Sequence, residues 1–419
     1  MIVTGGVTSM AETLYIRAGW LIDGSGGKVK KDMLLIVVDG KIIRMEAFRP
    51  DDAPDPRVVT DLSFGTILPP FIDCHVHLAM SGSMDPQIRE RQLVAGCEEL
   101  KPLIVVHLDQ HLAHGVMAVR DGGDREDCVA RFLCENKDKK HPVRVQTPGR
   151  AWHRQGRYGK LIGRCPEIGQ TLGEAFGSEG TGSGYVKLVN SGLNSLKIYG
   201  RETAPQFSQE EIGELVVLAG KQGRKVMVHA NGRQAVRDAV DAGCHSIEHG
   251  FFMGKENLQR MAERGCIWVP TACTMKAYAE ILEHGKNAAD AVIARKNLFH
   301  QLDQLYLARE LGVTVALGTD AGSPGVLHGE AVFEEMKLFV KAGYSLAETV
   351  QSATSVGARL MGLEDMGLLA EGRAANFLVA RGTPAQLPRK FSYLEDIYIG
   401  GKPSSFYRKN PHKHVRETG

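Results

Sequence analysis

The pattern of apolar and polar positions differs between the ends of the chain and its middle. Near the N-terminus, short apolar runs are separated by turn residues, and an Asp39-Gly40 pair between two such runs is typical of a tight hairpin. Residues 367–400 repeat this pattern, with Gly and Pro between short apolar segments. We therefore expect a small composite β domain, a β-sandwich built from residues 1–66 and 366–419 together.

The middle of the chain alternates strand-like and helix-like segments. Eight short apolar segments are candidate strands: residues 67–77, 115–121, 143–150, 185–189, 225–230, 246–250, 267–272 and 313–320. Helical patterns separate several of them, over residues 208–222, 232–242, 254–264, 286–311 and 346–361. Ser208 and Glu211 have the spacing of a capping box at the first of these helices. This alternation predicts an α/β fold, a (β/α)8 TIM barrel over residues 67–365.

Candidate metal ligands stand where the predicted barrel strands end. His75 and His77 are two residues apart, so a strand would direct both imidazoles to one side. Four further candidates each close a separate apolar segment: Lys187, His229, His249 and Asp320. The active site of a parallel barrel lies at the carboxyl ends of its strands, so the pattern predicts a catalytic metal site there.

Composition narrows the class of protein. The formal net charge of the 419 residues is +2, which gives no electrostatic reason to expect a nucleic-acid or membrane partner. No apolar run approaches the roughly 20 residues of a transmembrane helix, and residues 1–6 lack signal-peptide features. The eight cysteines are scattered without a Cys-x-x-Cys pair. We therefore expect reduced cysteines with no disulfide framework, and a cytoplasmic protein.

Five segments resemble the amidohydrolase superfamily, and one of them, residues 206–211, looks like the start of the helix after its fourth strand. Residues 67–78 look like its first barrel strand, residues 115–123 like its second, and residues 318–321 like its eighth. Residues 367–377 resemble the return to its small β domain. The likeness is greatest to imidazolonepropionase-like and prolidase-like members, which carry a carboxylated lysine on strand four.

The resemblance implies two divalent metal ions. His75, His77 and Asp320 would hold the first, and His229 and His249 the second. A carbamate on Lys187 would be the anion between them, because two neighbouring cations repel each other. Zinc is the expected metal, although imidazole also suits iron and nickel.

A second lysine competes with Lys187 as the bridging residue. Lys197 also lies in a segment that looks like the strand-four pattern. The Asn190-Ser191-Gly192 sequence that follows Lys187 is the closer match, so we favour Lys187. Only a buried lysine that loses its proton could carboxylate and bridge metals.

The expected reaction is hydrolysis of an amide C–N bond by hydroxide held on the metal, with Asp320 as general base and acid. Dipeptides, N-acyl amino acids and related amides or carbamates are the candidate substrates. Deamination of a nitrogen heterocycle is an alternative, but Gly232 stands where the deaminase branch has Glu. Hydrolysis of a lactone, phosphotriester or chlorinated ring stays open, as does a non-catalytic binding barrel.

The sequence identifies the substrate only as a small molecule. Five residues on predicted loops above the strands are candidate substrate contacts: Arg150, His153, Tyr199, Arg233 and His328. His107, His111 and His114 share one face of a predicted helix, but no acidic partner accompanies them as in a His-Glu-x-x-His site. Assembly into a homo-oligomer is left open.

Overall fold

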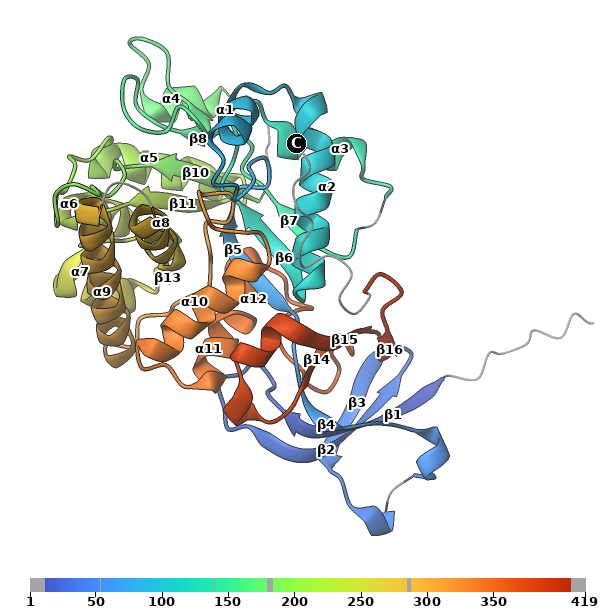
Figure 1. The fold of residues 1–419 in the computed structure, drawn as a ribbon. Coiled ribbons are helices and arrows are strands. Elements are labelled where there is room, and N and C mark those ends of the chain that lie inside the picture. Colours follow the sequence, from blue (N-terminus) through green and yellow to red (C-terminus); the bar gives the residue numbers. More distant parts are fainter. Residues whose placement is uncertain (1–11, 53, 140, 179–183, 285–287, 408–419) are drawn as a thin grey trace, which may run out of the picture.

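Strands from both ends of the chain join in one sheet in the computed structural model, which describes residues 12–52, 54–139, 141–178, 184–284 and 288–407 (Figure 1). The order of its seven strands is β16-β15-β14-β4-β1-β2-β3. Their bounds are β1 (Thr13–Leu21), β2 (Lys30–Val38), β3 (Lys41–Ala47), β4 (Val59–Leu68), β14 (Phe377–Arg381), β15 (Leu394–Ile399) and β16 (Lys402–Pro403). Both ends therefore build a single sheet, whereas two stacked sheets were expected.

Local sequence explains the pairing in this sheet. Asp39 and Gly40 both adopt positive φ, 49° and 76°, so the predicted hairpin between β2 and β3 is confirmed. Burial alternates only in part: Ile16 and Ala18 of β1 are buried on either side of Arg17, whereas Met33, Leu34 and Leu35 of β2 are buried in succession. The core beneath the sheet is apolar and includes Ile16, Leu35, Val37, Ile67 and Phe377.

Parallel strands form the middle of the chain. A six-stranded sheet has the order β13-β12-β11-β10-β8-β9, and a three-stranded sheet has the order β5-β6-β7. Their bounds are β5 (Phe71–Val76), β6 (Val116–Asp121), β7 (Arg144–Gln146), β8 (Ala151–Trp152), β9 (Gly163–Arg164), β10 (Tyr185–Val189), β11 (Lys225–Ala230), β12 (Ser246–His249) and β13 (Ile267–Val269). Paired strands in these two sheets run parallel to each other, which confirms the α/β class.

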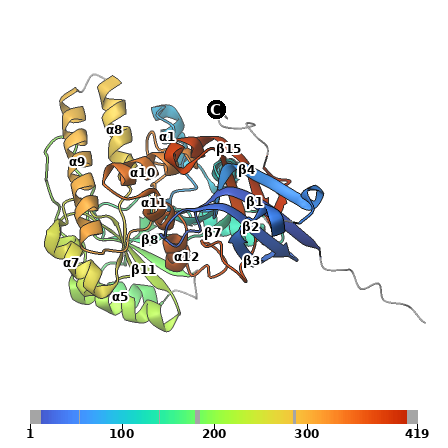
Figure 2. The same cartoon turned by 90° about the horizontal axis from the view of Figure 1, so that it is seen from below.

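Helices connect and cover these strands. They are α1 (Pro86–Val94), α2 (Cys97–Ala113), α3 (Cys128–Glu135), α4 (Leu172–Gly177), α5 (Gln209–Lys221), α6 (Arg233–Asp241), α7 (Gly254–Arg264), α8 (Cys273–His284), α9 (Ala288–Glu310), α10 (Glu330–Lys341), α11 (Leu346–Ser352) and α12 (Ser355–Met361). Ser208 and Glu211 form the expected capping box of α5. Helices α5, α7 and α9 lie on the side away from the seven-stranded sheet (Figure 2). Among the described helices, none is both long and apolar enough to cross a membrane.

Two of the expected strands are irregular. The segment expected at 313–320 pairs through a single bridge from Val315 to Trp268, and Ala321, which directly follows it, bridges to Val76. Its backbone still links β13 to β5, because Ala316 N–H donates to Trp268 O (2.9 Å) and Cys74 N–H donates to Leu317 O (2.9 Å). The segment expected at 143–150 contains only the short strand β7, and Pro148 with Gly149, whose φ is 72°, separates it from β8.

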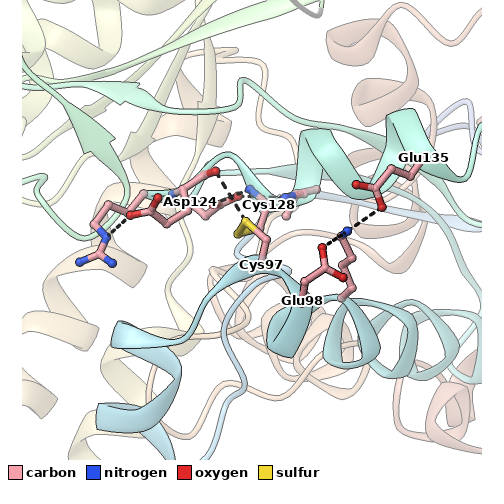
Figure 3. Close-up of a disulfide and its surroundings, with 9 residues drawn as sticks. Cys97, Glu98, Asp124, Cys128 and Glu135 are labelled. Carbon is pink, nitrogen blue, oxygen red and sulfur yellow. Dashed lines mark hydrogen bonds and ion pairs between the residues drawn. A yellow bond between two sulfur atoms is a disulfide. The ribbon is translucent and has the colours of Figure 1, made fainter.

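One disulfide corrects the expectation that the cysteines are reduced. Cys97 and Cys128, the first residues of α2 and α3, are bonded with their Cα atoms 5.0 Å apart (Figure 3). Asp124 accepts the N–H groups of Cys128 (2.8 Å) and Val129 (3.1 Å) at the start of α3, and Lys101 of α2 forms an ion pair with Glu135 of α3 (2.6 Å). The sequence spacing of 31 residues gives no motif, because the two cysteines meet only when α2 and α3 pack together.

Candidate functional site

Six of the sequence-predicted residues lie on the parallel strands or directly after a strand or strand-like segment. His75 is on β5 with His77 directly after it, Lys187 is on β10, and His229 and His249 are on β11 and β12. Asp320 follows the irregular segment that links β13 to β5. All six line one cavity of about 280 Å³. The structure therefore brings the predicted ligand set to one place.

Three of these side chains converge on a common point. The ligand atoms of His75, His77 and Asp320 all lie within 4.8 Å of one another. The Asp320 Oδ1 atom is 3.5 Å from His75 Nε2 and 3.3 Å from His77 Nε2. Burial alone would raise the pKa of Asp320, but the hydrogen bond from His77 and the nearby histidines hold that pKa well below its ordinary value. A carboxylate and two imidazoles in this arrangement are a suitable donor set for a divalent ion.

His75 and His77 are each oriented through the ring nitrogen that does not face Asp320. The Nδ1 atom of His75 lies 2.8 Å from Glu248 Oε2, and that of His77 lies 3.1 Å from Gly123 O. Both rings therefore turn Nε2 toward Asp320. Burial lowers the pKa of His75 to about 4, so this imidazole is neutral near pH 7 and keeps a lone pair for a ligand.

Glu248 and Arg120 form a buried ion pair that the sequence analysis missed. Arg120 Nη2 is 2.8 Å from Glu248 Oε1, and Arg120 also donates to Cys74 O (2.8 Å). Burial acts to raise the pKa of Glu248, but the charge of Arg120 and the hydrogen bond from His75 hold it well below its ordinary value. The adjacent acid and histidine in the Ile247-Glu248-His249 run were the available signal, although the partner Arg120 is distant in the chain. The pair therefore holds the His75 ring in position from the side opposite Asp320.

The two competing lysines have opposite environments. Lys187 is 1% exposed, and its Nζ lies 3.5 Å from His75 Nε2. Burial lowers its pKa to about 8. Lys197 is exposed in a turn after β10. Of the two, Lys187 alone has the burial that carboxylation requires.

His249 and His229 lie side by side next to this group. Their ring centroids are 4.5 Å apart, and His249 is 4.9 Å from the ring of His75. The Nδ1 atom of His249 lies 2.7 Å from Thr271 Oγ1, which leaves Nε2 for another partner. The Nε2 atom of His229 lies 3.3 Å from Gly192 O. Burial lowers the pKa of His249 to about 3 and that of His229 well below its ordinary value, so both rings are neutral.

The five predicted substrate contacts lie elsewhere in the described part of the chain, outside the lining of this cavity. Arg150 is exposed after β7, and Arg233 is exposed at the start of α6. His153 turns its Nδ1 to Arg154 O (3.0 Å), and Tyr199 packs on Phe252 with 5.4 Å between ring centroids. These side chains follow the expected strands, but local packing directs them away from the cavity.

His328 belongs instead to a buried histidine group beside α2. Its ring stacks on His107 with a centroid distance of 4.0 Å, and its Nδ1 lies 3.2 Å from His111 Nε2. Its Nε2 lies 2.8 Å from Met80 O, in the segment after His77. Within the described residues, the group of side chains placed to hold a metal is His75, His77 and Asp320, so the histidines of α2 do not form such a site.

The cavity wall contains further side chains that were not predicted. Arg89 of α1 lies on it, as do two tyrosines, Tyr158 and Tyr278. The Tyr158 ring is 5.4 Å from the ring of His229. Most of the remaining wall is apolar and includes Leu93, Leu161, Leu193, Leu196, Phe251 and Met275. Their sequence neighbourhoods carry no motif, so only the folded chain identifies them.

Comparison with known proteins gives one consistent result. The model of the family described as "Amidohydrolase family" matches residues 66–403. An uncharacterised protein of Mycobacterium tuberculosis is 25% identical over 400 residues, covering 94% of this chain and 96% of that protein. Ochratoxinase of Aspergillus niger is 25% identical over 450 residues, covering 95% and 85%. A crystal structure of a Xaa-Pro dipeptidase with bound methionine has the same fold, with a TM-score of 0.77, 24% identity and coverage of 94% and 100%.

Proposed function

The chain belongs to the amidohydrolase family, and on that premise we propose that it is a metal-dependent hydrolase of amides. The predicted resemblance to this superfamily and the prediction of a hydrolase acting on C–N bonds are confirmed. The observation that carries the finer proposal is the convergence of His75, His77 and Asp320 in the cavity that also contains Lys187.

The architecture that we propose for this activity is a (β/α)8 barrel with a small second domain. Residues 67–365 would form the barrel, closed by the segment between β13 and β5. Residues 1–66 and 366–419 would form the second domain around the seven-stranded sheet. The hydrogen bonds from Ala316 to Trp268 and from Cys74 to Leu317 support closure, because they continue the sheet edge on both sides.

The residues present fit two divalent ions, with zinc as our proposal. His75, His77 and Asp320 would hold the first ion, and His229 and His249 the second. A carbamate on Lys187 would supply the anion between them. The fit is supported by neutral imidazoles, a buried lysine and a carboxylate in one cavity. When bound, such ions lower the pKa of a water molecule and polarise a carbonyl group.

Asp320 would move the proton during hydrolysis. Its Oδ2 accepts a hydrogen bond from Ser323 Oγ (2.9 Å), which fixes the rotation of the carboxylate. Its Oδ1 faces His75 and His77. We propose that Asp320 takes a proton from water and delivers it to the leaving nitrogen. The names of two relatives, a dipeptidase and ochratoxinase, support an amide substrate for this chain.

Metal add-back with a substrate panel tests this function. Chelator-treated protein should release no amino acid from a panel of N-acyl amino acids and dipeptides, and zinc should restore release. Asp320→Asn should keep its bound metal and lose about 100- to 10,000-fold in kcat. The exposed Asp303→Asn is the matched control and should behave like the wild type. Full turnover in Asp320→Asn would contradict its role, and ammonia release from heterocycles without amide cleavage would favour deamination.

A further inference from the structure

The long helix α9 has two different sides. Its inner side is fixed to neighbouring loops, because Asn297 Nδ2 donates to Ser195 O (3.1 Å) and Gln304 Nε2 donates to Gly250 O (3.2 Å). In both views the helix lies at the edge of the molecule away from the seven-stranded sheet (Figures 1 and 2). On its outer side, exposed residues recur every three or four positions: Val292, Arg295, Lys296, Phe299, Asp303, Tyr306 and Glu310. With 3.6 residues per turn, these positions form one stripe about 100° wide.

The apolar residues of this stripe follow one line. Val292, Phe299 and Tyr306 are seven residues apart and are 46%, 50% and 54% exposed. Seven residues are close to two helical turns, so the three side chains lie one above another along the helix. Lys341 of α10 places its Nζ 5.0 Å from the centroid of the Phe299 ring, which nevertheless stays half exposed. Such a regular apolar line is typical of a helix that packs against another helix.

The charged residues follow a second line on the other side of the stripe. Lys296, Asp303 and Glu310 are also seven residues apart, with the cation at one end and the two carboxylates toward the other. The ion pairs that α9 forms within the described part of the chain use Arg295 and Arg309, so Lys296 and Asp303 take part in none of them. These two residues are about 10 Å apart along the helix axis, too far to pair with each other.

A second copy of α9 that runs antiparallel would match both lines. In a two-fold pair of helices, each side of the stripe meets the same side of the partner in reversed order. If Phe299 lies at the two-fold axis, Val292 is opposite Tyr306 of the partner subunit, since both are seven residues from the centre. Lys296 is then opposite Asp303 of the partner subunit, because the midpoint of this pair falls between residues 299 and 300. Both lines therefore share one centre to within half a residue.

We propose that α9 is the interface of a homodimer in which two copies of this helix pack antiparallel about Phe299. Every contact occurs twice in a two-fold interface, so the match of Lys296 with Asp303 supplies two ion pairs. One pair of helices buries less than the roughly 800 Å² per partner of a standard interface, so the dimer should form at micromolar concentrations. The inference does not depend on amide hydrolysis, because α9 contacts the loops at the strand ends with its other side.

Sedimentation velocity of the full chain across the micromolar range tests this interface. Phe299→Glu should raise the dimer Kd by at least about 30-fold, the effect of removing a central aromatic side chain. Val217→Glu makes a similar change at a 59% exposed apolar residue of α5 and should leave Kd unchanged. Asp303→Lys places like charges opposite each other and should raise Kd about 10-fold. The double variant Lys296→Asp/Asp303→Lys exchanges the charges and should return Kd to within about threefold of the wild type.

The charge exchange separates this arrangement from other modes of assembly. A double variant that dimerises no better than Asp303→Lys would show that Lys296 and Asp303 do not face each other, and the antiparallel pairing would be wrong. A wild type that stays monomeric, or an assembly that Phe299→Glu leaves intact, would also overturn the proposal. Circular dichroism and metal analysis should give wild-type values for each variant, because all the substituted positions are exposed. If Phe299→Glu does not fold, Asp303→Lys and the double variant decide alone.

Discussion

The carboxyl ends of the parallel strands and the seven-stranded sheet bury very different side chains. At the strand ends, His75, Lys187, Glu248 and Arg120 are at most 3% exposed. The core beneath the seven-stranded sheet consists of apolar side chains such as Ile16 and Ile67. Buried charges cost free energy unless they are paired or bind a metal, whereas apolar burial stabilises the fold directly. The contrast indicates that the strand ends are arranged for chemistry and the sheet for stability.

The largest effect should come from the lysine at the strand ends. Lys187→Ala should reduce bound metal from about two ions per chain to none, because the anion between the cations is lost. Lys197→Ala removes an exposed lysine and should leave metal content unchanged. Metal analysis of both variants, with circular dichroism to verify folding, measures the difference. Loss of metal in Lys197→Ala but not in Lys187→Ala would show that Lys197, and not Lys187, has the bridging role.

The second largest effect should come from removing one partner of the buried ion pair between Arg120 and Glu248. Arg120→Met leaves the charge of Glu248 unpaired and should lower the free energy of unfolding by about 3–5 kcal/mol. It should also weaken zinc binding by about 10- to 100-fold, because Glu248 orients His75. Ile67→Ala in the seven-stranded sheet should lower the free energy of unfolding by a comparable amount, about 2–5 kcal/mol, without changing zinc affinity. Urea unfolding and zinc titration would show this split, and unchanged zinc affinity in Arg120→Met would contradict it.

The disulfide should have an intermediate effect. It closes a sequence separation of 31 residues, and such a crosslink typically contributes about 2–4 kcal/mol by restricting the unfolded chain. A reducing agent or the Cys97→Ser variant should lower the unfolding free energy by this amount. Cys134→Ser, at an exposed free cysteine, is the control. Equal stability with and without reductant would show that the bond does not form in solution.

The smallest effect is expected on the outer face of the sheet. Arg381 of β14 and Glu395 of β15 form an exposed ion pair at 3.0 Å. Surface pairs of this kind contribute about 0.2–1 kcal/mol, because water and salt screen the charges. Arg381→Ala should therefore shift the urea midpoint only slightly, and less still at high salt. A loss comparable to that of Arg120→Met would remove the distinction between the two regions.

Local periodicity was sufficient for much of the fold. The hairpin at Asp39-Gly40 and the capping box at Ser208 depend on neighbouring residues, so the sequence alone predicts them. Irregular backbone was harder to foresee. At Gly318, an added Cβ would lie 2.4 Å from Val269 Cγ1 and 3.0 Å from His75 Cβ, so tertiary packing shapes this segment.

In the candidate site, too, the residues that local sequence marks could be predicted, and those that depend on tertiary contacts could not. Ligand candidates such as His229 close apolar runs, so the sequence indicated their position at strand ends. Arg89 and the pairing of Arg120 with Glu248 depend on contacts between distant segments, which no local pattern records. The sequence predicts a substrate contact at Tyr199 because this residue follows a strand, but its contact with Phe252 takes it away from the cavity. Loop conformation thus decides which side chains can meet a substrate.

The pairing of β4 with β14 has a consequence for biosynthesis. Leu68 lies opposite Leu378 in this ladder, so β4 cannot obtain its second neighbour until the ribosome has made nearly the whole chain. Until then the nascent N-terminal strands present an open edge, which can pair with other chains. A messenger truncated before codon 377 would leave that edge permanently uncovered, and its product should aggregate.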